Sequence, residues 1–181
     1  INMGIGQGPV RWTPIQAANV YATIARGGMM ISPTFLANPD RKHPQQAINL
    51  GLDPAGVALA LHGLDMAANT FLGSANHIKY PDGHREDTFD LDGVKIYAKS
   101  GTADTTPGQR IDSDGDGRIT SKDEIVKTGD HAWVIALVQR PGSSRPDFVV
   151  AVVVEYAGSG GRVSGPIANQ ILYAMRAEGY L

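Results

Sequence analysis

The chain has 181 residues, of which 42% are hydrophobic, and its 16 Lys and Arg nearly balance its 18 Asp and Glu, for a formal net charge of -2. This length suits one domain, and no basic run indicates a nucleic acid or an anionic membrane surface as a partner. The absence of cysteine excludes disulfides and thiolate metal sites. No apolar stretch of the sequence is long enough to span a bilayer.

Three helices are predicted, each with a proline near its start and apolar residues at helical spacing. The first, over 13–26, opens with Thr-Pro and ends at a Gly-Gly pair. The second, over 53–71, opens with Asp-Pro. The third runs over about 164–179 and has Pro166 at its start.

Strands are predicted from apolar runs. One over 93–98 leads into Lys99, and two continuous apolar runs, 132–138 and 148–154, indicate a hairpin that is buried on both faces. A short extended piece is expected over 32–35. Loops are expected over 38–46, over 73–92 and in the polar stretch between 103 and 131.

The sequence Lys99-Ser100-Gly101-Thr102 is the most informative motif. It supplies half of a serine acyl-transfer site, which also needs a nucleophilic serine with a lysine nearby, usually as Ser-x-x-Lys on a helix. No serine in this chain is followed by a lysine three residues later. Taken alone, the motif also fits a strand that leads into a glycine turn with a solvated lysine. In its context, it predicts one part of a catalytic unit whose nucleophile lies elsewhere.

Several segments resemble the transpeptidase domain of penicillin-binding proteins, most of all the monofunctional, class B type. The segments that carry the resemblance are Gly6-Gln7-Gly8, Thr13 to Gly28, Lys99 to Ala103, His131-Ala132-Trp133, Pro146 to Tyr156 and Gly158 to Gly161. Because they cover most of the chain in the family's order, the resemblance is more specific than any single motif. It implies an α/β (α+β) fold similar to penicillin-binding proteins and serine β-lactamases, with an antiparallel sheet flanked by helices, incomplete in this chain.

The resemblance also implies a reaction, in which the D-Ala-D-Ala end of a peptidoglycan stem peptide is cleaved and its acyl group passes to an amine. Lys99 would supply positive charge for the substrate carboxylate and help a proton relay, while the hydroxyls of Ser100 and Thr102 would hydrogen-bond that carboxylate. The Thr102 N–H would form one arm of the oxyanion hole. Gly101 would leave space for an extended peptide to pair with the strand. β-Lactams are expected as ligands of the same site.

On this interpretation, residues 1–181 form the C-terminal part of one transpeptidase domain. The sequence begins Ile1-Asn2-Met3-Gly4, with no initiator or signal peptide. We therefore expect an upstream portion that carries the Ser-x-x-Lys and Ser-x-Asn motifs, with a membrane anchor further upstream. The enzyme would work in the cell envelope, on the periplasmic or extracytoplasmic face, and this chain alone would be inactive.

Two other groups of residues are interpreted as structural. Ser74-Ala75-Asn76 has the spelling of Ser-x-Asn, but it follows the Gly6-Gln7-Gly8 segment, whereas in the family the motif precedes that segment. The five histidines show no metal-ligand spacing. His131 is expected to pack or hydrogen-bond at the start of its strand, and Trp133 to lie in the core.

Residues 112–123 fit the calcium loop of an EF-hand and form an insertion relative to the family. The candidate Ca²⁺ ligands are Asp112, Asp114, Asp116, the carbonyl of Arg118, Thr120 through water, and Asp123. Asp123 stands where most EF-hands have glutamate, which resembles the dockerin version of the loop, and Glu124 is an adjacent substitute. The alternative is a solvated acidic turn.

Calcium at this loop is expected to order the rim of the substrate groove without joining the chemistry. A second functional interpretation is a non-catalytic module on the same scaffold, which binds a partner in a calcium-dependent way or senses β-lactams. Upstream Ser-x-x-Lys and Ser-x-Asn motifs would favour the enzyme.

Overall fold

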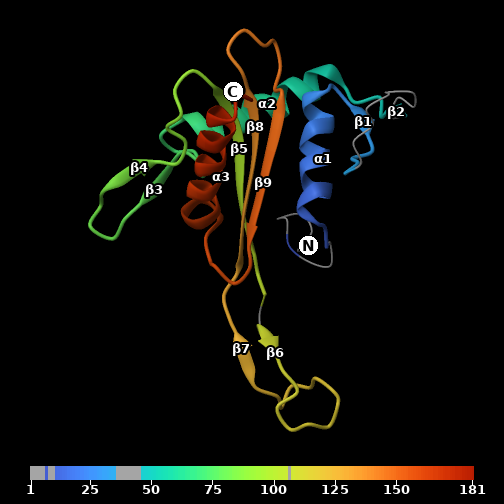
Figure 1. The fold of residues 1–181 in the computed structure, drawn as a ribbon, viewed down its shortest axis with the longest axis vertical. Coiled ribbons are helices and arrows are strands. Elements are labelled where there is room, and N and C mark those ends of the chain that lie inside the picture. The colour runs from blue at the N-terminus through green and yellow to red at the C-terminus, as the bar shows by residue number, and fades with distance from the viewer. Residues whose placement is uncertain (1–6, 8–10, 36–45, 106) are drawn as a thin grey trace.

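The computed structural model describes residue 7 and residues 11–35, 46–105 and 107–181. Its centre is a three-stranded antiparallel sheet in the order β5-β8-β9 (Figure 1). The strands are β5 (Lys95–Ala103), β8 (His131–Gln139) and β9 (Phe148–Val154). Their register aligns Ser100 with Val134, and Val134 with Val152. The predicted strand before Lys99 and the predicted hairpin are therefore confirmed.

β8 is the central strand, and it is buried on both faces. On one face its core partners lie on α3 (Gly160–Ala177), and this cluster contains Val134, Ala136, Val138, Ala168 and Leu172. On the other face Leu137 lines a pocket with Ala22 and Ala25 of α1 (Pro14–Ala25). The predicted burial on both faces holds for β8, whereas β9, an edge strand, is only partly buried.

α1 and α2 (Pro54–Asn69) begin where their caps predict. Thr13 and Gln16 form a capping box, in which Gln16 N–H donates to Thr13 Oγ1 at 3.4 Å and Thr13 N–H donates to Gln16 Oε1 at 2.8 Å. α1 and α3 lie on opposite sides of the sheet in Figure 1, and α2 packs against β5. In the parts of the chain that the structure describes, no helix combines the length and apolarity needed to cross a bilayer.

α3 begins at Gly160, so the predicted start near residue 164 is wrong, and Pro166 lies inside the helix. A proline at that position removes one backbone hydrogen bond. The first turn is set by glycines that let the helix approach the sheet closely. A Cβ on Gly160 would lie 2.1 Å from the carbonyl oxygen of Gly101. Tertiary packing, rather than periodicity along the helix, therefore fixes its start.

Small antiparallel strand pairs lie outside the main sheet, and none was predicted. They are β1 (Met29–Ile31) with β2 (Ala47–Asn49), β3 (His77–Lys79) with β4 (Arg85–Asp87), and β6 (Gln109–Arg110) with β7 (Ile125–Lys127). The short extended piece expected over 32–35 follows β1 directly and belongs to no strand. The loop expected over 73–92 contains β3 and β4. Of the loop expected over 38–46, residues 38–45 lie outside the described residues.

β6 and β7 form an arm that projects from the end of the sheet where β5 stops and β8 starts (Figure 1). The loop over 111–124 lies at the tip of this arm, away from the sheet. This loop therefore extends outward from the end of the sheet.

Candidate functional site

Among the described residues, β5 is an edge strand, paired with β8 on one side only. The N–H and C=O of a strand residue point to the same side, and successive residues point to opposite sides. The carbonyls of Ile96, Ser100 and Thr102 accept hydrogen bonds from side chains that do not belong to β8. The even-numbered residues of β5 therefore present their backbone N–H and C=O groups to the free edge. The Lys99 to Thr102 motif lies in the second half of β5.

Lys99 is exposed, and its Nζ lies at this edge. It donates to the carbonyl oxygen of Ser100 at 2.6 Å. An ammonium group has three donors, so two remain for an anion. The structure thus places a positive charge beside the free edge, where the motif predicts it.

Ser100 points its hydroxyl toward the loop that follows α2. Its Oγ lies 3.1 Å from the carbonyl oxygen and 3.1 Å from the Oγ of Ser74. A hydroxyl has one hydrogen, and a carboxylate only accepts, so Ser100 can donate to a substrate carboxylate only if its hydrogen turns away from Ser74. Ser74 therefore lies directly beside the motif. Asn76 has a structural role, since its amide donates to the carbonyl of Ala68 at 2.9 Å.

Thr102 is exposed and lies beside the first turn of α3. Its Oγ1 accepts the N–H of Gly160 at 3.4 Å, which leaves the hydroxyl hydrogen of Thr102 able to donate. The first N–H groups of a helix and its dipole carry partial positive charge. Together with the Lys99 ammonium, they make this part of the edge electropositive, which suits a carboxylate or a developing oxyanion.

Gly101 lies where β5, β8 and α3 come close together. A Cβ on Gly101 would be 3.3 Å from the Cβ of Trp133, and a Cβ on Gly160 would be 2.2 Å from the carbonyl oxygen of Trp133. Trp133 itself is half-buried and does not belong to the buried core cluster, so the expectation that it lies in the core is not met. The tight contact with Trp133 on β8 favours glycine at 101, and the close approach to two backbone carbonyls favours glycine at 160.

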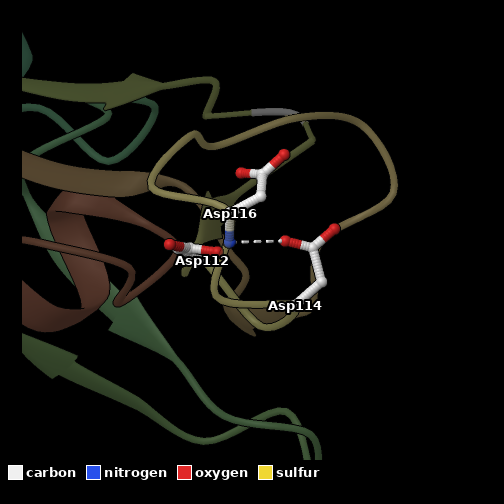
Figure 2. A group of neighbouring side chains, drawn as sticks. All are labelled: Asp112, Asp114 and Asp116. Atoms are coloured by element: carbon white, nitrogen blue, oxygen red, sulfur yellow. Dashed lines mark hydrogen bonds between the residues drawn. The ribbon is translucent and has the colours of Figure 1, made fainter.

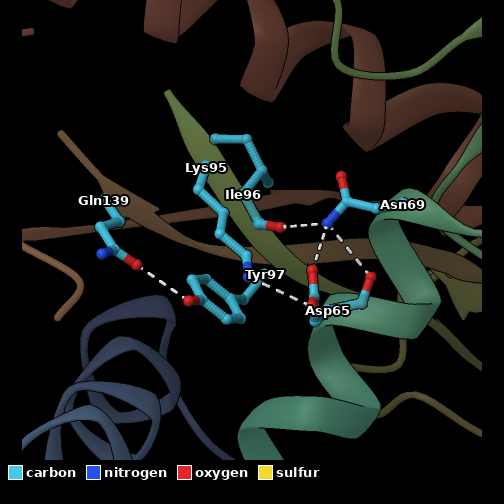
Figure 3. Close-up of polar contacts among 6 residues, drawn as sticks. All are labelled: Asp65, Asn69, Lys95, Ile96, Tyr97 and Gln139. Atoms are coloured by element: carbon cyan, nitrogen blue, oxygen red, sulfur yellow. Dashed lines mark hydrogen bonds and ion pairs between the residues drawn. The ribbon is translucent and has the colours of Figure 1, made fainter. Parts of the chain in front are cut away.

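The start of the free edge is covered by α2. The Nδ2 of Asn69 donates to the carbonyl oxygen of Ile96 at 2.8 Å and to the Oδ1 of Asp65 at 2.7 Å (Figure 3). Asp65 also pairs with Lys95, with 3.2 Å between Oδ2 and Nζ. These contacts tie β5 to α2 ahead of the motif and occupy the edge there.

The far end of the edge is occupied by Gln7. Its Nε2 donates to the carbonyl oxygen of Thr102 at 2.8 Å, and its Oε1 accepts the N–H of Asp104 at 3.2 Å. The Gly6-Gln7-Gly8 segment contributed to the family resemblance, but sequence reasoning gave Gln7 no role. A single polar residue between two glycines is a weak signal, and the contact joins residues that lie 95 positions apart.

His131 has a structural role at the start of β8. Its Nδ1 accepts the N–H of Tyr156 at 3.0 Å, and the two rings lie edge to face with 4.8 Å between their centroids. The expectation that His131 packs or hydrogen-bonds at this position is confirmed. Among the described residues, no histidine belongs to a cluster of possible metal ligands.

Asp112, Asp114 and Asp116 converge at the tip of the β6–β7 arm (Figure 2). Each offers a carboxylate oxygen, and these oxygens all lie within 4.8 Å of one another. The two oxygens of Asp112 accept the N–H groups of Gly115 and Gly117, each at 2.8 Å. Two unit charges 4 Å apart interact by about 4 kcal/mol at an effective dielectric of 20. The repulsion among the three carboxylates favours a cation with a preference for oxygen ligands.

Asp123 holds the loop together from within and is not one of the three converging residues. It is 3% exposed, and its oxygens accept the N–H of Ser113 at 3.1 Å and that of Thr120 at 2.5 Å. These backbone hydrogen bonds, from Thr120 first and then from Ser113, lower the pKa of the Asp123 carboxyl. Arg118 lies in the same loop, where its N–H donates to Asp116 at 2.7 Å.

The chain is similar to known proteins in both sequence and fold. The family model of the penicillin binding protein transpeptidase domain matches residues 1–173. Among curated proteins, the chain is similar to the peptidoglycan D,D-transpeptidase PbpA of Mycolicibacterium smegmatis, with 29% identity over 97% of this chain and 31% of the relative.

Among solved structures, the chain is similar to the apo TP domain of Burkholderia pseudomallei penicillin-binding protein 3, with a TM-score of 0.60, 22% identity, and coverage of 93% of this chain and 43% of that one. It is also similar to a peptidoglycan glycosyltransferase from Burkholderia ambifaria, with a TM-score of 0.59, 22% identity, and coverage of 92% and 41%. These likenesses confirm the expected fold class, a mixed helical and antiparallel-sheet fold that is incomplete here. The chain spans less than half the length of each of these relatives.

Proposed function

Because this chain belongs to the penicillin-binding protein transpeptidase domain family, we propose that it forms the C-terminal part of a serine D,D-transpeptidase and provides its substrate-binding strand. The acyl donor would be the D-Ala-D-Ala end of a peptidoglycan stem peptide, and β-lactams would acylate the same site. An upstream portion would supply the nucleophilic Ser-x-x-Lys and the Ser-x-Asn motif. This chain alone would be inactive.

The reaction consists of two acyl transfers. The upstream serine attacks the carbonyl carbon of the penultimate D-alanine, the C–N bond to the terminal D-alanine breaks, and the leaving amine takes up a proton. An amine of a second stem peptide then attacks the acyl-enzyme, forms the new C–N bond and releases the serine. Each transfer passes through an oxyanion, which preorganised N–H donors stabilise.

In this proposal, each residue of the motif has a separate role. The Lys99 ammonium binds the terminal carboxylate and supports the proton relay, and the Thr102 hydroxyl donates to that carboxylate. The Thr102 N–H is one donor of the oxyanion hole, while Gly101 keeps the strand close to β8 and α3. Ser100 would join the carboxylate contacts if its hydroxyl turned away from Ser74.

One observation carries the proposal, namely the orientation of Thr102. Its carbonyl accepts a hydrogen bond from the Gln7 side chain at the free edge, so its N–H points to the same edge. Its hydroxyl lies at the first turn of α3, 3.4 Å from the N–H of Gly160. An N–H donor, a hydroxyl donor and a lysine therefore face one electropositive edge.

The proposal is tested on the intact domain, with labelled penicillin and with a peptide that ends in D-Ala-D-Ala. Lys99→Gln is expected to lower the acylation rate by about 100-fold or more, since charge stabilisation in such sites has effects of that order. Lys95→Gln is the matched control, because Lys95 lies on the same strand but pairs with Asp65 at 3.2 Å. As a partly exposed ion pair, it should change the rate by no more than about threefold. Equal effects of the two variants would contradict the proposal.

The alternative is a non-catalytic binding or β-lactam-sensing module on the same scaffold. A β-lactam sensor would react with penicillin but would not release D-alanine from the peptide, and a calcium-dependent binding module would do neither. The two readouts of the same experiment therefore separate the enzyme from the sensor.

We further propose that residues 112–123 bind a structural Ca²⁺, which would support the arm. The ligands would be Asp112, Asp114, Asp116, the Arg118 carbonyl, Thr120 through water, and Asp123. The convergence of three carboxylate oxygens within 4.8 Å supports this proposal. Because the loop lies at the tip of the β6–β7 arm, the ion would order the arm and would not contact the reacting atoms. Asp123 would have to exchange its backbone hydrogen bonds for the metal.

The site of action follows from the substrate. Peptidoglycan lies in the cell envelope, so the enzyme would work on the periplasmic or extracytoplasmic face. A membrane anchor, if it accompanies the domain, would belong to the upstream portion.

A further inference from the structure

The free edge of β5 is covered by side chains at both of its ends. At its start, the Asn69 amide bonds the carbonyl of Ile96 at 2.8 Å. At its end, the Gln7 amide bonds the carbonyl of Thr102 at 2.8 Å and the N–H of Asp104 at 3.2 Å. Between these two amides lies a short window, in which the N–H groups of Ala98, Ser100 and Thr102 face the edge. A ligand that adds to this edge as an extended strand has only this window available.

The geometry points to Gln7 as a positioning residue for the proposed acyl transfer. We propose that its amide acts in place of a neighbouring strand, so that it fixes the peptide groups on both sides of Ala103 and ends ligand pairing at Thr102. This role rests on the proposed function, and none of the residues assigned above to the chemistry supplies it.

The chemistry of the amide fits this role. A primary amide has both a donor and an acceptor, which are the two kinds of group that a strand edge needs. Gln7 uses its donor on Thr102 and its acceptor on Asp104, two successive backbone groups at the same edge. An unpaired edge would otherwise leave these groups to solvent or to another strand. A carboxylate in the same place would accept from Asp104, but it would repel the carbonyl oxygen of Thr102.

The consequence for catalysis concerns the Thr102 N–H. An oxyanion hole works because its donors are held in place before the charge develops. The Thr102 carbonyl belongs to the peptide group that joins Thr102 to Ala103. A hydrogen bond to this carbonyl therefore limits rotation about the backbone bonds of Thr102, whose N–H is the proposed donor. Gln7 touches neither substrate nor nucleophile in this proposal. Gln7 acts through Thr102. Loss of the Gln7 side chain should therefore lower the rate constant of acylation more than it raises the dissociation constant of the first complex with the ligand.

The test uses the intact domain and resolves β-lactam acylation into the dissociation constant of the first complex and the rate constant of the acylation step. Gln7→Ala and Gln7→Glu are each expected to lower the rate constant at least about tenfold, short of the 10²–10³ typical for removing an oxyanion donor itself. In Gln7→Ala, which adds no charge, the dissociation constant is expected to change by less than about threefold. Gln7→Glu keeps the acceptor for Asp104, loses the donor to Thr102 and places a negative charge beside the Thr102 carbonyl.

Gln16→Ala is the matched control. Gln16 is a glutamine in the same N-terminal region, and its side chain accepts a backbone hydrogen bond, from Thr13 at 2.8 Å. Its loss should lower the melting temperature through the capping box and leave the acylation rate constant unchanged. Faster hydrogen exchange at the Asp104 amide in Gln7→Ala, but not in Gln16→Ala, would support the contact independently.

The outcomes are distinguishable. A wild-type domain that penicillin does not acylate would refute the proposed function, and with it the role of Gln7. A wild-type domain that is acylated, together with Gln7 variants whose rate constants stay within twofold of it, would refute the role of Gln7 alone. Equal losses in Gln7→Ala and Gln16→Ala would show a general effect on stability and would also refute the role.

Discussion

The hydroxyl of Ser100 donates to the carbonyl oxygen of Ser74, with 3.1 Å between the two oxygens. This contact ties the second residue of the Lys-Ser-Gly-Thr motif to the loop after α2. In contrast, the Thr102 hydroxyl accepts from the first N–H of α3 and keeps its hydrogen for a ligand. The two hydroxyls of the motif therefore have different roles: the Ser100 hydroxyl contacts the loop after α2, and the Thr102 hydroxyl can donate to a ligand.

We predict that Thr102→Val and Ser100→Ala have separate effects in the intact domain. Thr102→Val removes a donor to the ligand carboxylate and should raise the dissociation constant of a β-lactam about tenfold, since hydrogen bonds to charged groups contribute about 1.5–3 kcal/mol. Ser100→Ala should instead lower the free energy of unfolding by about 1 kcal/mol through the lost contact with Ser74. Rapid-mixing kinetics and denaturant unfolding measure the two quantities. The assignment is wrong if Ser100→Ala weakens ligand binding as much as Thr102→Val does.

The close approach of α3 to the sheet makes Gly160 intolerant of a side chain. A Cβ there would lie 2.1 Å from the carbonyl oxygen of Gly101 and 2.2 Å from that of Trp133, both of them backbone atoms. Gly160→Ala should therefore destabilise the domain by about 3 kcal/mol or more, at the upper end of the overpacking range. Gly63→Ala is the control, because Gly63 lies inside α2 with no atom within 4 Å of an added Cβ. It should stabilise the domain by about 0.4–1 kcal/mol. Similar losses in both variants would argue against the close packing.

Asp147 should make stability sensitive to acid. Its carboxylate accepts the backbone N–H of Arg140 at 2.9 Å, pairs with the Arg140 guanidinium at 3.0 Å and accepts from Ser143 at 2.9 Å. These contacts, the Arg140 backbone bond first, lower the pKa of Asp147 in the folded chain. Protonation is thus harder in the folded state than in the unfolded state.

The stabilisation by Asp147 should be complete above its ordinary pKa of about 3.9 and should be lost as the pH falls through the lower folded pKa. Melting temperatures of wild type and Asp147→Asn between pH 7 and pH 2 check this. The wild type should melt higher at neutral pH, and the difference should shrink in acid. A difference that stays constant down to pH 2 would disprove the linkage.

Calcium should protect the tip of the β6–β7 arm from proteolysis. In the intact domain, adding Ca²⁺ is expected to slow cleavage within 111–124, and a chelator should restore it, because the ion neutralises three converging carboxylates. Asp112→Asn should remove this protection, since Asp112 contributes to the cluster. Asp87→Asn, in the exposed strand β4, should not. Cleavage that is equally fast with and without Ca²⁺ would exclude a structural calcium.

The main sheet was predictable because its strands are continuous apolar runs, and α1 and α2 were predictable because local caps mark their starts. The start of α3 was not. Gly160 begins that helix because it fits against the backbone of Gly101 and Trp133, which lie far away in the sequence. β1 to β4, β6 and β7 are short and mostly polar or exposed, so they lack the alternation that identifies a strand.

In the candidate site, too, some residues could be predicted from a local motif and others could not. Lys99 and Thr102 could be proposed as site residues from the sequence because the motif is contiguous and lies in a predicted strand. The contact of Gln7 with Thr102 could not be predicted, because it joins residues 95 positions apart and no local pattern encodes it. Ser74 was set aside on motif order, and only the folded chain reveals that it lies against Ser100. Residues that act by position rather than by type need the tertiary structure.

The central claim is that this chain supplies the substrate-binding strand while the nucleophile lies upstream. The most direct test is the intact mass of the chain after incubation with labelled penicillin, measured with the chain alone and with the intact domain, followed by mapping of the labelled residue. We predict an adduct only in the intact domain, on a serine outside residues 1–181. An adduct on the chain alone, at Ser74 or another of its own serines, would contradict the account.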